Sequence, residues 1–107
     1  MEIKQYEILL VNLDPTVGGE IKKTRPCVVI SPNEMNKYLK TIVIAPITSS
    51  SKQYPTRIEL NQKKINGWIV LDQIRIIDKS RIIKKIADLS KLEIDRIKEV
   101  MHETFVE

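Results

Sequence analysis

An arginine beside a proline is the first residue of this sequence whose setting suggests chemistry. Arg25 stands between Thr24 and Pro26 in the segment KKTRPCVVISP, just ahead of an apolar stretch. Pro26 fixes its own φ angle and biases the residue before it towards an extended backbone, so Arg25 occupies a stiff strand entrance. Two interpretations fit this placement. Arg25 is either a charge that keeps a hydrophobic strand from aggregating, or a rigidly aimed cation that receives an anion.

A run of hydroxyl groups, Thr48 to Ser51, follows the apolar segment TIVIAPIT. Pro46 lies inside that segment and predicts a strand edge or a bulge there. By itself the run is typical of a polar loop whose side chains bond to the nearby backbone. If the strands that carry Arg25 and Thr48 are neighbours, however, a guanidinium and a hydroxyl reach the same rim. Such groups suit RNA cleavage, in which the 2′-OH attacks the adjacent phosphate and the enzyme aligns it and stabilises charge.

A third polar group interrupts an apolar segment further along the chain. In Leu71-Asp72-Gln73-Ile74-Arg75 an acid, an amide and a cation occupy three of four consecutive positions, which we expect to lie within a strand. A solvated strand edge accounts for this pattern. Contacts with base edges, which need paired donors and acceptors, account for it equally.

Other kinds of catalytic site are missing from the sequence. His102 is the only histidine, so one chain cannot supply a two-histidine acid–base pair, and we expect it at the surface or facing a partner. The sequence has no Cys/His cluster with zinc-ligand spacing and no tight pair of carboxylates. It also lacks a glycine-rich phosphate loop and a G-x-S-x-G motif. We therefore expect any catalysis to use arginine and hydroxyl groups, without a metal or a cofactor.

Length and composition predict one globular domain. The 107 residues are 42% hydrophobic and 30% charged, enough to build a core in a soluble protein. No apolar run approaches the ~20 residues that span a bilayer, and the N-terminus lacks the pattern of a signal peptide. The single cysteine, Cys27, fits a reducing compartment. We expect a cytoplasmic protein without a membrane partner.

The charges are unevenly distributed along the chain. Residues 1–64 carry ten Lys or Arg against six Asp or Glu, whereas residues 65–107 carry eight of each. A cationic first half suggests a face for RNA or DNA, and an ordinary basic surface is an equally good explanation.

Hydrophobic periodicity predicts a mainly β fold with a C-terminal helix. Ser90 and Glu93 have the spacing of a capping box, and apolar residues follow at helical spacing, so a helix is expected over 91–105. Roughly five to seven short strands before it suggest a small barrel, about residues 5–89 of a single domain spanning 1–107. The expected strands are 7–14, 25–31, 41–48, 56–61, one or two within 68–78, and a short strand or turn at 82–89, with loops at 15–23 and 49–55 and one or two helical turns at 33–39.

Four segments in register resemble the MazF/PemK family of type II toxin endoribonucleases. They are LVNLDPTVGGEIKKTRPCVVIS, TIVIAPITSS, YPTRIEL and VLDQIRIIDKSRI. The resemblance implies an SH3-like barrel of the PemK/CcdB type, a C-terminal helix and a homodimer. It also implies sequence-specific, ribosome-independent cleavage of single-stranded mRNA by 2′-OH attack, leaving a 2′,3′-cyclic phosphate and a 5′-OH and halting translation. A cognate antitoxin would place an acidic peptide along the RNA groove.

The resemblance also assigns roles to residues. Arg25 and Thr48 correspond to the catalytic pair of the family, and Asp72 and Gln73 to a pair that contacts bases. Gly19 stands where the family often has serine. The remaining expected RNA-binding residues are the loop residues Thr16, Gly18, Gly19 and Glu20, the phosphate-holding Lys22, Lys23 and Lys52, and Ser49 and Gln53 in the variable segment 49–54.

Two alternatives remain open at this point. The first is a non-catalytic poison of DNA gyrase, similar to the CcdB toxins. Those proteins rely on a tryptophan-glycine-isoleucine ending, whereas this chain ends HETFVE and has its only tryptophan at position 68. The second is an RNA-binding barrel without catalysis, which the basic first half allows. A cyclic phosphate on the product separates the enzyme from both.

Overall fold

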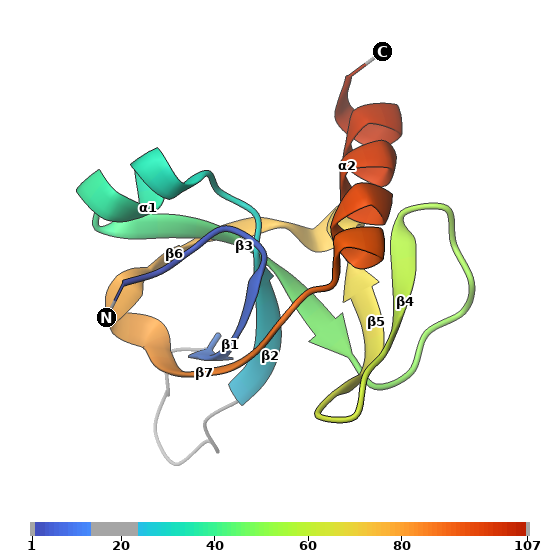
Figure 1. The fold of residues 1–107 in the computed structure, drawn as a ribbon, viewed down its shortest axis with the longest axis horizontal. Helices are drawn as coiled ribbons and strands as arrows, with labels where there is room; N and C mark the ends of the chain where they lie inside the picture. Colours follow the sequence, from blue (N-terminus) through green and yellow to red (C-terminus); the bar gives the residue numbers. More distant parts are fainter. Residues whose placement is uncertain (1, 14–23, 107) are drawn as a thin grey trace.

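Seven antiparallel strands and two helices make up the part of the chain that the structure describes, residues 2–13 and 24–106 (Figure 1). The structure is a computed structural model. Its elements are β1 Glu7–Asn12, β2 Thr24–Val29, α1 Asn33–Tyr38, β3 Thr41–Thr48, β4 Arg57–Asn61, β5 Asn66–Val70, the 3₁₀ turn η1 Leu71–Gln73, β6 Arg75–Asp78, the 3₁₀ turn η2 Lys79–Arg81, β7 Ile82–Asp88 and α2 Lys91–Phe105.

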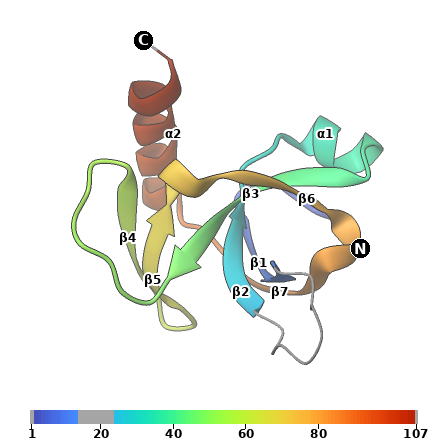
Figure 2. The same cartoon turned by 180° about the vertical axis from the view of Figure 1, so that it is seen from behind.

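The strands form one curved sheet in the order β4-β5-β3-β2-β1-β7, with β6 paired to β3 beside β5. The prediction of a mainly β protein with a terminal helix is confirmed. Within the described residues the sheet stays open, because β4 and β7 end the strand order without pairing to each other. The helix α2 stands beside β4 and β5, and its last turns extend past the sheet (Figures 1 and 2).

The long strand β3 joins two sections of the sheet. Its residues 41–44 pair with β6, and its residues 47–48 pair with β5. Pro46 falls between these pairings. The carbonyl of Val43 accepts hydrogen bonds from the β2 side, so by alternation the backbone of Pro46 faces the β5/β6 side. The prediction of an edge at Pro46 holds only locally: β3 is an interior strand, but residues 45 and 46 have no partner on the β5/β6 side. Here an interior strand tolerates proline because its missing N–H points to the place where the partner strand changes.

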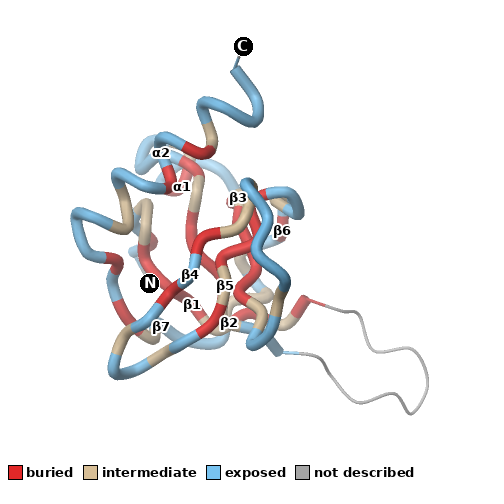
Figure 3. The backbone as a smooth tube through the Cα atoms, turned by 90° about the vertical axis from the view of Figure 1, so that its right-hand side faces the viewer, coloured by how far each residue is buried: buried red, intermediate tan, exposed pale blue. Residues whose placement is uncertain are grey.

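Side chains are buried on both faces of the sheet, which explains its apolar runs. Buried residues occur along most of the strands (Figure 3). Ile8 and Val28 point into one core cluster, together with Ile97 and Val100 of α2. Their sequence neighbours point to the opposite face and build a second cluster, whose members include Leu9, Val11, Cys27, Val29, Ile42 and Ile44. Because β1 and β2 are packed on both faces, the strand that carries Arg25 is firmly held.

The capping box at the start of α2 is present as the sequence predicts. The Ser90 side chain accepts a bond from the Glu93 backbone at 3.2 Å, and Glu93 Oε1 accepts from the Ser90 backbone at 2.7 Å. The Gln62 side chain also donates to Glu93 Oε1, at 2.8 Å. This bond ties the β4–β5 hairpin to the helix. The first residue of β4 is Arg57, so the bond also supports the strand that carries this arginine. His102 is exposed on α2, as expected.

The segment after β5 differs from its prediction. Asp72 and Gln73 were expected inside a strand, but they lie on η1, between β5 and β6. The backbone N–H of Leu71 donates to Thr56 O at 3.1 Å, so the chain turns against the start of β4 instead of continuing straight. The segment 82–89, which we expected to be a short strand or a turn, forms β7.

No helix within the described residues has the length and apolar character that crossing a bilayer requires.

Candidate active site

A cavity of about 490 Å³ opens where β2, β3, β4 and η1 meet. It brings together three residues to which the sequence assigned a role in the site, Arg25, Thr48 and Gln73. It adds two guanidinium groups, those of Arg57 and Arg75. The rest of its lining consists of Leu13, Pro46, Ser50 and Val70. Three arginines, a threonine hydroxyl and an amide therefore surround one volume large enough for part of a nucleotide chain.

The pairing of β2 with β3 explains why Arg25 lies near Thr48. Cys27 pairs with Pro46, and this antiparallel register, extended by two residues, sets Arg25 opposite Thr48. The expectation that the two strands are neighbours is thus confirmed. Both residues also line a second groove of about 490 Å³ with Ser49 and Asn66. The Thr48 hydroxyl donates to Ser50 O at 3.2 Å.

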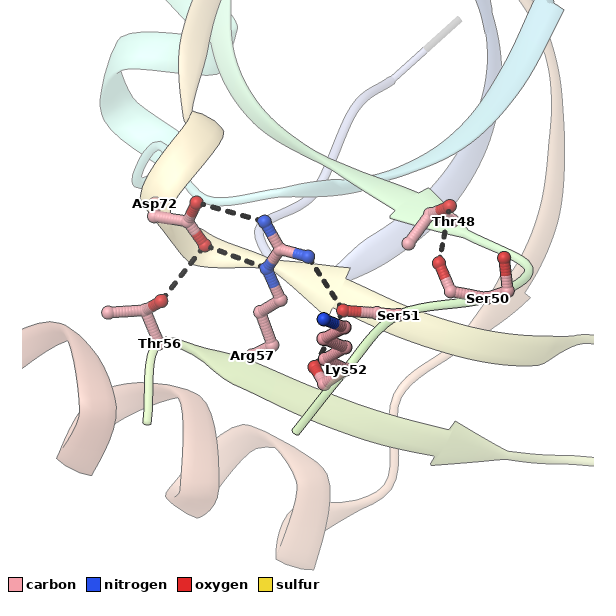
Figure 4. Close-up of polar contacts among 7 residues, drawn as sticks. All are labelled: Thr48, Ser50, Ser51, Lys52, Thr56, Arg57 and Asp72. Atoms are coloured by element: carbon pink, nitrogen blue, oxygen red, sulfur yellow. Dashed lines mark hydrogen bonds and ion pairs between the residues drawn. The ribbon is translucent and has the colours of Figure 1, made fainter. Parts of the chain in front are cut away.

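Arg57 is the most constrained cation of the cavity (Figure 4). Its Nε donates to Asp72 Oδ1 at 3.3 Å, and its Nη2 donates to Asp72 Oδ2 at 3.4 Å. Its Nη1 donates to Ser51 Oγ at 2.6 Å. The Tyr54 ring centroid lies 4.8 Å from the guanidinium carbon. Arg57 therefore links the 49–55 loop, which begins just after Thr48, to the turn that carries Asp72 and Gln73.

Asp72 is held as an ionised carboxylate by these contacts. The hydrogen bonds from Arg57, and that from the Thr56 hydroxyl at 2.9 Å, lower the pKa of Asp72 below its usual value, against a smaller opposing effect of desolvation. Both carboxylate oxygens are already engaged within the protein. Asp72 is thus adjacent to the cavity, but its carboxylate oxygens bond to Thr56 and Arg57.

The other residues predicted to bind RNA are more dispersed. Gln53 lines a separate groove of about 470 Å³ beside Trp68 and Leu92 of α2. Lys52 is exposed on the 49–55 loop, where its carbonyl accepts from Ser51 Oγ at 2.8 Å. Six of the predicted residues lie outside the described part of the chain: Thr16, Gly18, Gly19, Glu20, Lys22 and Lys23.

Sequence reasoning missed Arg57 as a site residue and did not assign Arg75 to the site. Arg57 alternates with apolar residues in the segment TRIEL, a pattern that predicts only a solvent-facing position. Its pairing with Asp72 joins residues 15 apart in sequence, through a turn that the pattern did not indicate. For Arg75 a signal existed, since it shares a polar group with Asp72 and Gln73.

The charge and the hydroxyl of the cavity suit an anion with several oxygen acceptors. Guanidinium groups present planar forks of donors that match phosphate oxygens, and a threonine hydroxyl adds a short donor beside them. In residues 2–13 and 24–106, His, Cys, Asp and Glu side chains nowhere gather in threes as metal ligands would.

Cys27 supports the strand that carries Arg25, and its environment makes a testable prediction. The thiol is fully buried and donates to Arg25 O at 3.6 Å. Burial raises its pKa from 9.0 to about 12, although Arg25 and Arg75 oppose the shift. At pH 8 we expect alkylation of native Cys27 by iodoacetamide to be slower than in urea by on the order of 10³ or more, because the buried thiol is inaccessible to the reagent and burial also makes its thiolate rare. Mass spectrometry of timed samples measures both rates, and equal rates would contradict the burial.

The same shift has a consequence at alkaline pH. Between pH 9 and pH 12 the unfolded chain loses the thiol proton while the folded chain keeps it. Folding stability contributed by the neutral thiol is complete below pH 9 and decreases as the pH rises through this range.

Several solved structures share this fold. The chain superposes on MazF (Form-I) from Deinococcus radiodurans with a TM-score of 0.81 and 23% identity, covering 96% of each chain. It matches the MazE–MazF complex (Form-II) of that organism with a TM-score of 0.82 and 25% identity over 96% of this chain and 92% of the other. An endoribonuclease in complex with its cognate antitoxin, from Mycobacterial species, gives a TM-score of 0.81 at 15% identity, covering 94% and 92%.

The family itself follows from the sequence match. Residues 4–105 fit the family described as the PemK-like, MazF-like toxin of type II toxin-antitoxin systems. The chain belongs to this family, which confirms the resemblance seen in the four sequence segments.

Proposed function

We propose that this protein is a metal-independent, ribosome-independent endoribonuclease toxin that cleaves single-stranded mRNA at a short sequence. The observation that carries the proposal is the convergence of Arg25, Thr48 and two further arginines on one cavity. In the proposed reaction the 2′-oxygen of a ribose forms a bond to the adjacent phosphorus and the bond to the 5′-oxygen breaks. The 2′-OH loses its proton and the leaving 5′-oxygen gains one, so the products are a 2′,3′-cyclic phosphate and a 5′-OH.

Arg25 and Thr48 have complementary roles in this proposal. Arg25 binds the scissile phosphate and stabilises the charge that develops on its oxygens in the transition state. A guanidinium keeps its proton at neutral pH, which favours this electrostatic role over that of a general base. Thr48 donates a hydrogen bond to the phosphate or to the leaving 5′-oxygen. Its present bond to Ser50 O is the one that substrate would replace.

The proposed partners follow from the same cavity. Three guanidinium groups favour a polyanion, so an acidic antitoxin peptide and the RNA would compete for one surface. Solved structures that resemble this chain include a MazE–MazF complex and an endoribonuclease in complex with its cognate antitoxin. We further propose that the toxin works as a homodimer in the cytoplasm. Lys52, with Lys22 and Lys23, would hold flanking phosphates, and binding would then weaken as salt increases.

Cleavage of a mixed RNA pool in EDTA tests this function. We expect the purified protein to cut RNA equally well with and without the chelator, because the proposed chemistry uses only side chains. Sequencing the new 5′ ends and analysing the 3′ termini by mass spectrometry should reveal 5′-OH and 2′,3′-cyclic phosphate groups.

Other results would favour a different function. Loss of activity in EDTA, or 5′-phosphate products, would contradict the metal-free mechanism. Binding of RNA with no cleavage would support the RNA-binding barrel, and inhibition of DNA gyrase would support the gyrase poison.

A further inference from the structure

We propose that Arg57, held in place by Asp72 and Ser51, recognises a guanine of the substrate RNA through the O6/N7 edge of the base. This inference rests on the proposed RNA cleavage and adds to it a residue that selects sequence. It concerns the cluster formed by Arg57, Asp72, Thr56 and Ser51 at the wall of the cavity (Figure 4). The ring of Tyr54 lies beside the guanidinium of this cluster.

The donors of Arg57 that remain available form a pair. A guanidinium has five N–H donors, one on Nε and two on each terminal nitrogen. Asp72 engages Nε and one hydrogen of Nη2, and Ser51 engages one hydrogen of Nη1. One N–H on each terminal nitrogen is left. Two neighbouring donors match the O6 and N7 acceptors of guanine, which is the commonest specific contact of arginine with a base.

The cluster keeps this pair of donors in a fixed orientation. Asp72 holds one side of the guanidinium and Ser51 the opposite end, while Tyr54 lies beside it. The Arg57 side chain is only 20% exposed and still lines the cavity. Because little rotamer freedom remains to be lost, base recognition would cost less ordering entropy than with a free arginine.

Charge favours a base over a phosphate as the ligand of Arg57. Asp72 compensates the charge of Arg57 through an ion pair. Neither Arg25 nor Arg75 has a salt bridge within the described residues, although both line the same cavity. Among the described residues, phosphate groups would therefore bind the two arginines that form no ion pair there. The uncharged edge of a base suits Arg57, whose charge is compensated by Asp72.

This assignment changes the role of Asp72. The sequence suggested that Asp72 itself contacts a base. In the structure its Oδ1 accepts from Thr56 and Arg57, and its Oδ2 accepts from Arg57. We infer that Asp72 is a positioning residue that acts through Arg57. Gln73, which lines the cavity directly, remains a candidate for base contact.

The test compares cleavage profiles of the wild type, Arg57→Lys and Asp72→Asn on the same mixed RNA pool. We expect the wild type to require guanine at one position near the cleaved bond. Arg57→Lys should reduce that preference by on the order of 10-fold and keep the preferences at other positions. Lysine retains the charge but loses the planar fork of donors that Asp72 and Ser51 hold in place. Asp72→Asn should also reduce the preference for guanine.

Modified substrates and a matched variant complete the test. An oligonucleotide with 7-deazaguanine at that position lacks N7 and should be cut slowly by the wild type, while inosine, which keeps O6 and N7, should be cut normally. Arg57→Lys should distinguish the three substrates less sharply than the wild type does. Arg96→Lys makes the same change on α2, where Arg96 pairs with Glu99, and should retain the wild-type profile. Circular dichroism and thermal unfolding confirm that each variant is folded.

Two results would overturn the inference while leaving the proposed function intact. One is a wild-type profile without a guanine requirement. The other is an equal loss at every sequence in Arg57→Lys, which would indicate a phosphate contact. A wild type that cuts no RNA would instead overturn the proposed function itself.

Discussion

Replacement of Arg25 by alanine is expected to slow RNA cleavage by on the order of 10²–10³, with little change in the fold. The side chain is exposed at the cavity, so its removal leaves the core intact and should change the free energy of unfolding by no more than about 0.5 kcal/mol. The lost rate reflects the missing charge stabilisation on the scissile phosphate. Single-turnover cleavage of a labelled oligonucleotide, together with urea unfolding, measures both quantities.

Thr48→Val extends this experiment to the hydroxyl. Valine keeps the shape and β-branching of threonine but cannot donate a hydrogen bond, so cleavage should again fall strongly. Thr41→Val provides the matched control, because Thr41 is half-buried at the opposite end of the same strand. Equal cleavage by the wild type and Arg25→Ala would show that Arg25 only guards the strand against aggregation.

Gly67→Ala is expected to impair both stability and cleavage through the backbone of Thr48. Gly67 has a φ angle of 154° and pairs with Leu60 in the β4–β5 hairpin. An added Cβ would lie 2.5 Å from Thr48 O and 2.9 Å from Ile47 Cγ2. The nearest atom belongs to the backbone, so β5 and β3 must move apart. We expect the free energy of unfolding to fall by about 1–3 kcal/mol. In the protein that remains folded, the displacement of Thr48 should reduce the rate of cleavage.

Urea unfolding and a cleavage assay in the folded range measure these two effects separately. Lys64→Ala is a suitable control, because Lys64 is exposed in the same hairpin and its change should stay within about 0.5 kcal/mol. A Gly67→Ala protein that is as stable and active as the wild type would show that the strands accommodate the methyl group without moving Thr48.

Local sequence pattern was enough to locate most elements of this protein. The capping box at Ser90 and the apolar spacing after it predicted α2 over the residues it occupies. Apolar runs between turn signals predicted the strands, and the order of Arg25, Pro26 and Thr48 suggested a shared rim. These features depend on neighbours close in sequence, because backbone restriction, capping and side-chain alternation act within a few residues.

The arrangement of the cavity depends instead on contacts between distant segments. Pro46 fits an interior strand only because β3 changes partner from β6 to β5 at that point. Asp72 meets Arg57 only because η1 turns the chain against the start of β4. Which strands pair, and where a strand breaks, follow from the free energy of packing the whole sheet, which no short window of sequence contains. The family and the pair Arg25–Thr48 could therefore be proposed from the sequence, whereas the arginine that we expect to select the RNA sequence became visible only in the folded chain.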